Sequence, residues 1–136
     1  MMSKIIKSLF LFCLLFAACN KNDDNLYQAE GYIVGFDPCT IRHNYDIGYV
    51  IISSNLKDTL LTYNFPDTIY NFPKEYFQNY VNSGYFPSTA RYEFHIHITY
   101  SIAKEDESIY HLCATDINMS EFYKAIQVII KIVSKY

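Results

Sequence analysis

The chain is short and mildly acidic, with 136 residues and a formal net charge of −3 at pH 7. This length allows one domain with one modest hydrophobic core. Lysine and arginine form no cluster along the chain, so the sequence lacks the basic patch that nucleic-acid binding requires.

The amino terminus predicts export and lipid attachment. Two lysines precede an apolar run over residues 8–16, and two alanines stand directly before Cys19. This order is typical of a secretory signal, and the apolar run is too short to cross a bilayer as a helix. Residues 15–19 (Leu-Phe-Ala-Ala-Cys) resemble a bacterial lipobox. The resemblance implies a signal peptide over 1–18 and a lipid, with palmitate as one possible acyl chain, on Cys19.

The residues after Cys19 predict a flexible tether between the lipid and the domain. Residues 20–25 (Asn-Lys-Asn-Asp-Asp-Asn) contain no apolar side chain. They also resemble the Lys/Asp-rich stretch of surface-displayed lipoproteins of the Bacteroidota. We therefore expect the lipidated cysteine and tether over 19–29, one β-rich domain over 30–136, and anchoring at the outer membrane or cell surface.

The first half of the domain predicts three strands and a helix. Residues 31–37 place Tyr32, Val34 and Phe36 on one face, residues 47–53 form a β-branched run, and residues 59–63 follow a turn, so each segment predicts a strand. The polar segment 39–46 predicts a loop. Over 73–83, aromatic residues recur at helical spacing between a proline and a glycine, which predicts a short amphipathic helix.

The second half predicts two strands and a C-terminal third. Residues 91–102 alternate most clearly, and 108–115 predict the strand that returns from a charged loop. The C-terminal segment fits a helix or a strand. Because β-branched residues dominate 126–133, we expect a short turn at 119–124 followed by a strand.

The predicted order is three strands, a helix and two strands. This is the element order of an OB-fold, a small, partly open Greek-key barrel. We therefore predict a mainly β chain with a small OB-like β-barrel and one short helix between the third and fourth strands. A small β-sandwich with an appended helix is the alternative fold.

The cysteines predict one disulfide. Cys13 leaves with the signal peptide and Cys19 receives the lipid, so Cys39 and Cys113 remain. Two cysteines in an exported domain most simply pair with each other. The alternative is two buried free thiols.

His95 and His97 are the strongest candidates for chemistry. Residues two apart on a strand share a face, so both imidazoles could bind one zinc ion. A catalytic zinc also needs a third protein ligand, for which His43 and His111 are candidates that nothing in the sequence places nearby. We favour the alternative that both histidines lie on the polar face of a strand, and we expect no metal and no cofactor.

Other catalytic or metal-binding patterns are lacking. Residues 105–107, with Asp116 further on, do not show the ligand spacing and glycine of a calcium loop, so we expect the solvated tip of a hairpin there. The chain has no Gly-x-Ser-x-Gly motif and no glycine-rich phosphate loop. We therefore expect no catalytic residues and no enzymatic activity.

Four stretches of the domain resemble a group of short Bacteroidota lipoproteins. They are residues 31–39 (Gly-Tyr-Ile-Val-Gly-Phe-Asp-Pro-Cys), 57–60 (Lys-Asp-Thr-Leu), 63–66 (Tyr-Asn-Phe-Pro) and 125–131 (Ala-Ile-Gln-Val-Ile-Ile-Lys). The resemblance implies an envelope location and transfers no catalytic residue.

The sequence as a whole predicts a membrane-anchored envelope lipoprotein that acts as a non-catalytic binding or structural module. The fourteen tyrosines suit a β-rich core and its rim, and they leave room for an aromatic face that contacts a protein, peptide or glycan. Two alternatives are an inhibitor or immunity lipoprotein that blocks an envelope enzyme, and a zinc hydrolase built on His95 and His97.

Overall fold

The computed structural model describes residues 25–43, 46–55, 57–78, 84–113 and 124–136. Within these residues the chain forms five strands, one short α-helix and two short 3₁₀ helices. In chain order they are β1 (Tyr27–Phe36), α2 (Pro38–His43), β2 (Tyr49–Ser53), β3 (Thr59–Thr62), η1 (Lys74–Phe77), η2 (Ser88–Ala90), β4 (His95–Ile102) and β5 (Ile126–Lys135).

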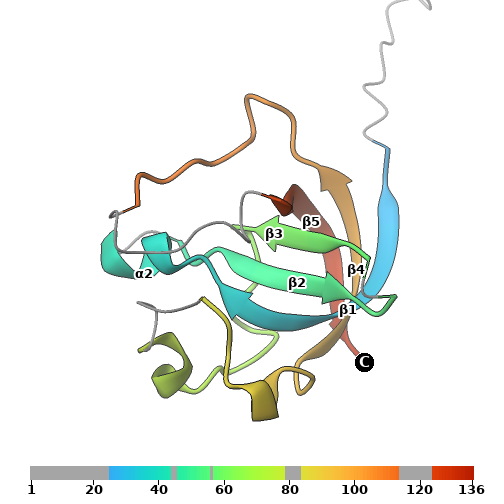
Figure 1. The fold of residues 1–136 in the computed structure, drawn as a ribbon. Coiled ribbons are helices and arrows are strands. Elements are labelled where there is room, and N and C mark those ends of the chain that lie inside the picture. Colours follow the sequence, from blue (N-terminus) through green and yellow to red (C-terminus); the bar gives the residue numbers. More distant parts are fainter. Residues whose placement is uncertain (1–24, 44–45, 56, 79–83, 114–123) are drawn as a thin grey trace, which may run out of the picture.

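The five strands close into a barrel in the order β1-β2-β3-β5-β4, and β4 pairs with β1 to complete the ring (Figure 1). The strand pairs are antiparallel except for β3 and β5, which run parallel. The predicted small β-barrel is therefore confirmed, and the alternative of a β-sandwich is wrong.

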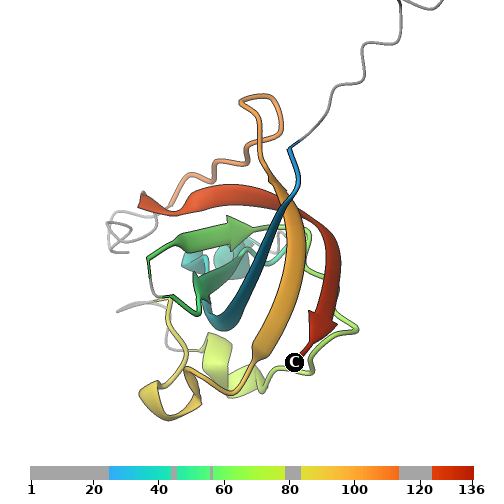
Figure 2. The ribbon, with the colours of Figure 1, turned by 90° about the vertical axis from the view of Figure 1, so that its right-hand side faces the viewer.

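The barrel has two distinct ends. β1 begins, β4 ends and β5 begins at the same end, because Tyr27 pairs with Tyr100 and Ile102 pairs with Val128. This end is uppermost in Figures 1 and 2, and we call it the tether end because residues 1–24 precede it in the chain. The far end is the opposite one, where β4 begins and β5 ends.

Aromatic rings fill the far end of the core. The segment between β3 and β4, which lies below the barrel in both views, contributes Phe65, Phe72, Phe86 and Phe94. The ring centroid of Phe72 lies 4.7 Å from that of Phe94, 5.5 Å from that of Phe86 and 5.1 Å from that of Tyr49. Many of the aromatic side chains therefore pack in the core, as the amino-acid composition of the chain suggests.

The predicted helix over 73–83 is wrong for the part that the structure describes. Lys74–Phe77 forms a single 3₁₀ turn, and residues 79–83 lie outside the described residues. The ring centroids of Tyr76 and Phe77 lie 5.3 and 5.9 Å from that of Phe86. Their helical spacing therefore reflects rings packed into the barrel end rather than one face of a helix.

The short α-helix lies instead between β1 and β2, inside the segment predicted as a loop. Its start has a clear local cause, since the backbone N–H of Cys39 donates to Asp37 Oδ1 at 2.9 Å and Pro38 occupies the first helical position. An aspartate cap followed by proline is a favourable way to begin a helix.

The strand predicted over 108–115 is also wrong for residues 108–113, the part of it that the structure describes. Residues 108–113 have no ladder partner, because β4 is already paired on both sides, with β1 and β5. The C-terminal strand is confirmed as β5 and supplies the fifth strand of the barrel. β1 begins at Tyr27, so the domain starts three residues earlier than predicted. Asp116 and most of the predicted turn at 119–124 lie outside the described residues.

Candidate binding site on the outer face of the barrel

The outer face of β1, β4 and β5 brings nine side chains together, and we call it the three-strand face. They alternate along each strand with side chains that point into the barrel. The ladder register places them in the cross-strand rows Tyr32–His95–Tyr136, Glu30–His97–Ser134 and Gln28–Thr99–Ile132. His95 and His97 therefore share one face, as their spacing predicts.

The first row is a stack of aromatic rings. The centroid of the His95 ring lies 4.4 Å from that of Tyr32 and 4.0 Å from that of Tyr136, with interplanar angles of 17° and 24°. Tyr92 packs its edge on Tyr32 at 5.2 Å, and Tyr136 also stacks on His97 at 4.9 Å. The row forms an aromatic wall across three strands.

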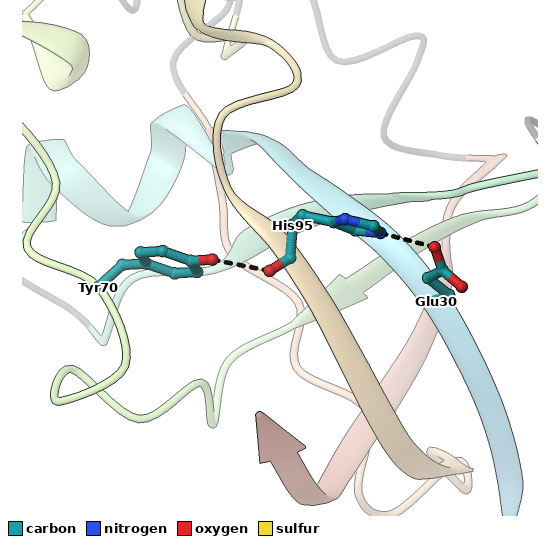
Figure 3. Close-up of polar contacts among 3 residues, drawn as sticks. All are labelled: Glu30, Tyr70 and His95. Atoms are coloured by element: carbon teal, nitrogen blue, oxygen red, sulfur yellow. Dashed lines mark hydrogen bonds and ion pairs between the residues drawn. The ribbon is translucent and has the colours of Figure 1, made fainter. Parts of the chain in front are cut away.

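Polar contacts hold His95 in place (Figure 3). Its Nε2 lies 2.8 Å from Glu30 Oε1, an ion pair when the imidazole is protonated. The hydroxyl of Tyr70 donates to the main-chain oxygen of His95 at 2.7 Å. Burial raises the pKa of Tyr70, which favours the protonated hydroxyl that this bond needs. The imidazole is thus fixed by two rings, one carboxylate and its own backbone.

A groove of about 350 Å³ lies beside this wall, over the second and third rows. The side chains that line it include a carboxylate, an amide, an imidazole and two hydroxyls, from Glu30, Gln28, His97, Thr99 and Ser134. Ile132 is exposed and supplies an apolar surface at one side. The groove therefore offers hydrogen-bond donors and acceptors together with flat apolar surface, which is the mixture found in small-ligand sites.

The structure gives no support to a three-ligand metal site at the histidines. Among the described residues, Asp37, Cys39 and Cys113 are the group of three potential metal ligands whose atoms lie within 4.8 Å of one another. The two cysteines form a disulfide, as predicted, so neither is a free thiolate. His111 packs by its edge on Tyr63, with 5.3 Å between centroids. The side chain of His43 lies outside the described residues.

The disulfide joins the start of α2 to a segment over residues 103–113, which we call the arm, with 5.2 Å between the two Cα atoms. The arm begins with a turn in which residues 104–107 are exposed, as predicted. This turn is not the tip of a hairpin, because residues 108–113 form no strand. At Ile109 it is held by Gln127 of β5, whose side-chain amide accepts from the backbone N–H at 2.8 Å and donates to the backbone oxygen at 2.7 Å.

A second, smaller groove of about 250 Å³ lies between the arm, β3 and β5. At its floor the hydroxyl of Tyr63 donates to Asp37 Oδ2 at 2.8 Å. Burial first, and then the nearby Asp37 carboxylate, raise the pKa of Tyr63 well above its ordinary value. Tyr63 thus contacts both Asp37 and, through its ring, His111 of the arm, and the hydroxyl and the carboxylate occupy each other.

Sequence reasoning found the histidines and the disulfide but missed the rest of the face. Glu30 and Gln28 lie in a stretch that was assigned mostly to the tether, and Ser134 and Tyr136 lie at the end of a strand of uncertain type. The polar alternation of Gln28, Glu30 and Tyr32 was the signal that could have revealed them.

No family model, curated protein or solved structure matches the chain. Among the described residues, no helix has the length and apolar character needed to cross a membrane.

Proposed function

We propose that this protein is a lipid-anchored, non-catalytic binding protein of the cell envelope, whose three-strand face binds a short saccharide. The proposal depends on one observation: a groove of about 350 Å³ with five polar side chains lies beside a wall of stacked rings. The lipobox at Cys19 supports the anchoring.

The chemistry of the groove favours a hydroxyl-rich ligand. Each sugar hydroxyl both donates and accepts, and the groove provides an acceptor carboxylate, an amide with both functions and two hydroxyls. Glu30 can accept from a ligand while Oε1 lies against His95, because a carboxylate offers several acceptor positions. Tyr136 and Ile132 offer exposed apolar surface for the C–H face of a sugar ring.

Other ligand classes fit less well. A nucleic acid or another polyanion would be repelled by Glu30 and by the acidic chain as a whole. A zinc reaction needs three protein ligands, and among the described residues His95 and His97 belong to no group of three ligand atoms within 4.8 Å of one another. A binding role requires neither a metal nor an activated nucleophile.

The test is a glycan-array screen of the full-length lipidated protein in detergent, followed by affinity measurement for the best saccharide. Replacing Glu30 by Gln removes the charged acceptor, and we expect affinity to fall by about tenfold or more. Glu93→Gln is the matched control, because Glu93 is exposed outside the groove. We expect that control to bind as the wild type does.

Failure to bind any saccharide, or equal affinity of wild type and Glu30→Gln, contradicts the proposal. Capture of an envelope enzyme that the protein inhibits would favour the immunity-type alternative. Stoichiometric zinc that disappears in a His95→Ala, His97→Ala double variant would favour the hydrolase.

A further inference from the structure

Exposed apolar side chains gather at one end of the barrel. Of the ten large apolar or aromatic side chains that are exposed among the described residues, seven belong to the tether end or the arm. They are Leu26 and Tyr27 at the start of β1, Ile102 at the end of β4, Ile109, Tyr110 and Leu112 on the arm, and Ile126 at the start of β5. The remaining three are Tyr92, Ile132 and Tyr136.

The arm shows the most extreme exposure. Leu112 is 94% exposed and Tyr110 is 82% exposed, although the arm is fastened by the disulfide and by Gln127. Single exposed apolar residues are common, but a group of them at one end of a small domain marks a surface that meets an apolar partner. A fixed arm presents these side chains without a further cost of ordering the backbone.

The position of the lipid indicates which partner that is. Leu26 lies seven positions after Cys19, and an extended chain spans at most about 3.6 Å per residue, so the tether end lies within roughly 25 Å of the lipid. Tethering keeps this end at a high effective concentration beside the bilayer. Leucine, isoleucine and tyrosine are also the side chains that partition into the bilayer interface.

The charge of this end defines the kind of lipid. The turn over residues 104–107 (Lys-Glu-Asp-Glu) carries one base and three acids, all exposed. A net acidic surface is not attracted by anionic headgroups. The contact with the bilayer is therefore apolar, and it favours zwitterionic phospholipid.

We propose that the tether end and the arm lie on the bilayer surface, with Tyr110 and Leu112 inserted at the interface of zwitterionic phospholipid. The inference rests on the proposed lipid anchor. In this orientation the far end points away from the bilayer and the three-strand face stays open to solvent at the side of the barrel.

Because the chain has no tryptophan, single-tryptophan variants can report on each end. Tyr110→Trp places the reporter on the arm. Tyr92→Trp is the matched control at the far end, because Tyr92 lies three positions before β4 begins and is 61% exposed. The full-length lipidated variants are reconstituted in phosphatidylcholine vesicles with or without doxyl-labelled lipid. Intact mass first confirms the lipid on Cys19, with Cys19→Ala as the unlipidated control.

We expect doxyl lipid to quench Tyr110→Trp and to leave Tyr92→Trp unchanged. A shallow doxyl group should quench more than a deep one, since interfacial side chains insert by about 5–10 Å. Adding anionic lipid should reduce the quenching. If intact mass shows no lipid on Cys19, the proposed anchor is wrong and this inference falls with it. If the lipid is present but Tyr110→Trp is not quenched, or Tyr92→Trp is quenched equally, the anchor stands and the docking is wrong.

Discussion

At the scale of single residues, Asp37 links three parts of the molecule. It is 2% exposed, and its carboxylate accepts from the backbone of Cys39 and from the hydroxyl of Tyr63. It follows the last residue of β1, caps the start of α2, and contacts Tyr63, the residue directly after β3. A buried carboxylate is tolerated when hydrogen bonds satisfy it, so both partners are needed.

Replacing Tyr63 by Phe tests this requirement. The change removes one of the two hydrogen bonds to the buried carboxylate, and we expect the free energy of unfolding to fall by about 1–3 kcal/mol at neutral pH. Urea unfolding of the lipidated protein in detergent measures it. Tyr110→Phe is the control, because Tyr110 is exposed and its loss of a hydroxyl should change little. Equal unfolding midpoints for Tyr63→Phe and the wild type would contradict the role of Asp37.

The same substitution changes the response to alkali. The pKa of Tyr63 is raised in the folded protein, so the folded chain holds this proton more tightly than the unfolded chain, whose tyrosines titrate near 10. The stability that this proton contributes is complete below a pH of about 10 and is lost as the pH rises above it. We expect Tyr63→Phe to lose less stability than the wild type between neutral pH and a pH of about 11. Tyr49, whose pKa burial raises to about 12, keeps some alkaline sensitivity in both proteins.

At the scale of elements, the sequence predicted those whose patterns are local. Residues 49–53 of the β-branched run became β2, whose side chains are nearly all buried. Residues 95–102 of the alternating stretch became β4, whose buried and less buried side chains alternate, while residues 91–93 form a turn instead of a strand. The arm was predicted wrongly, since whether a segment joins a sheet depends on a free strand edge. That edge was taken by β5, which comes later in the chain. The arm is therefore not held by backbone ladder hydrogen bonds at Ile109. The side-chain amide of Gln127 makes two hydrogen bonds to the Ile109 backbone instead.

Gln127→Leu tests the hold on the arm. Removing the two hydrogen bonds at Ile109 should speed amide exchange over residues 103–113, while the barrel strands keep the protection of the wild type. Hydrogen–deuterium exchange read by mass spectrometry measures both regions. Gln78→Leu, at an exposed position after η1, is the matched control. Unchanged exchange of the arm would show that its other contacts, the disulfide among them, fix it without the Gln127 side chain.

At the scale of the whole molecule, the two ends and the side of the barrel differ in the side chains they carry. Aromatic rings close the far end, exposed apolar side chains cover the tether end, and the polar groove lies on the side between them. That His95 and His97 share this side could be predicted from the sequence, because residues two apart on one strand lie on the same face whatever the strand pairs with. The cross-strand row that contains Glu30 and Ser134 could not be predicted, because it depends on the register in which β1 and β5 pair with β4.

The Cys39–Cys113 disulfide is the covalent link across this molecule, and its removal should be costly. The bond spans a sequence separation of 74 residues. Closing a loop of that length stabilises the fold by about 4 kcal/mol in the chain-entropy description. A small domain has about 5–15 kcal/mol in total, so the loss is a large share. We expect reductant to lower the urea midpoint of the wild type and to release the arm to rapid amide exchange.

The control for this prediction is a Cys39→Ala, Cys113→Ala double variant. It should unfold near the midpoint of the reduced wild type and should not respond to reductant, because it has no bond to break. Alkylation under denaturing, non-reducing conditions should leave both cysteines of the wild type unmodified. A wild type whose midpoint does not move on complete reduction would show that the core and the Asp37–Tyr63 contact hold the arm and barrel together without the bond.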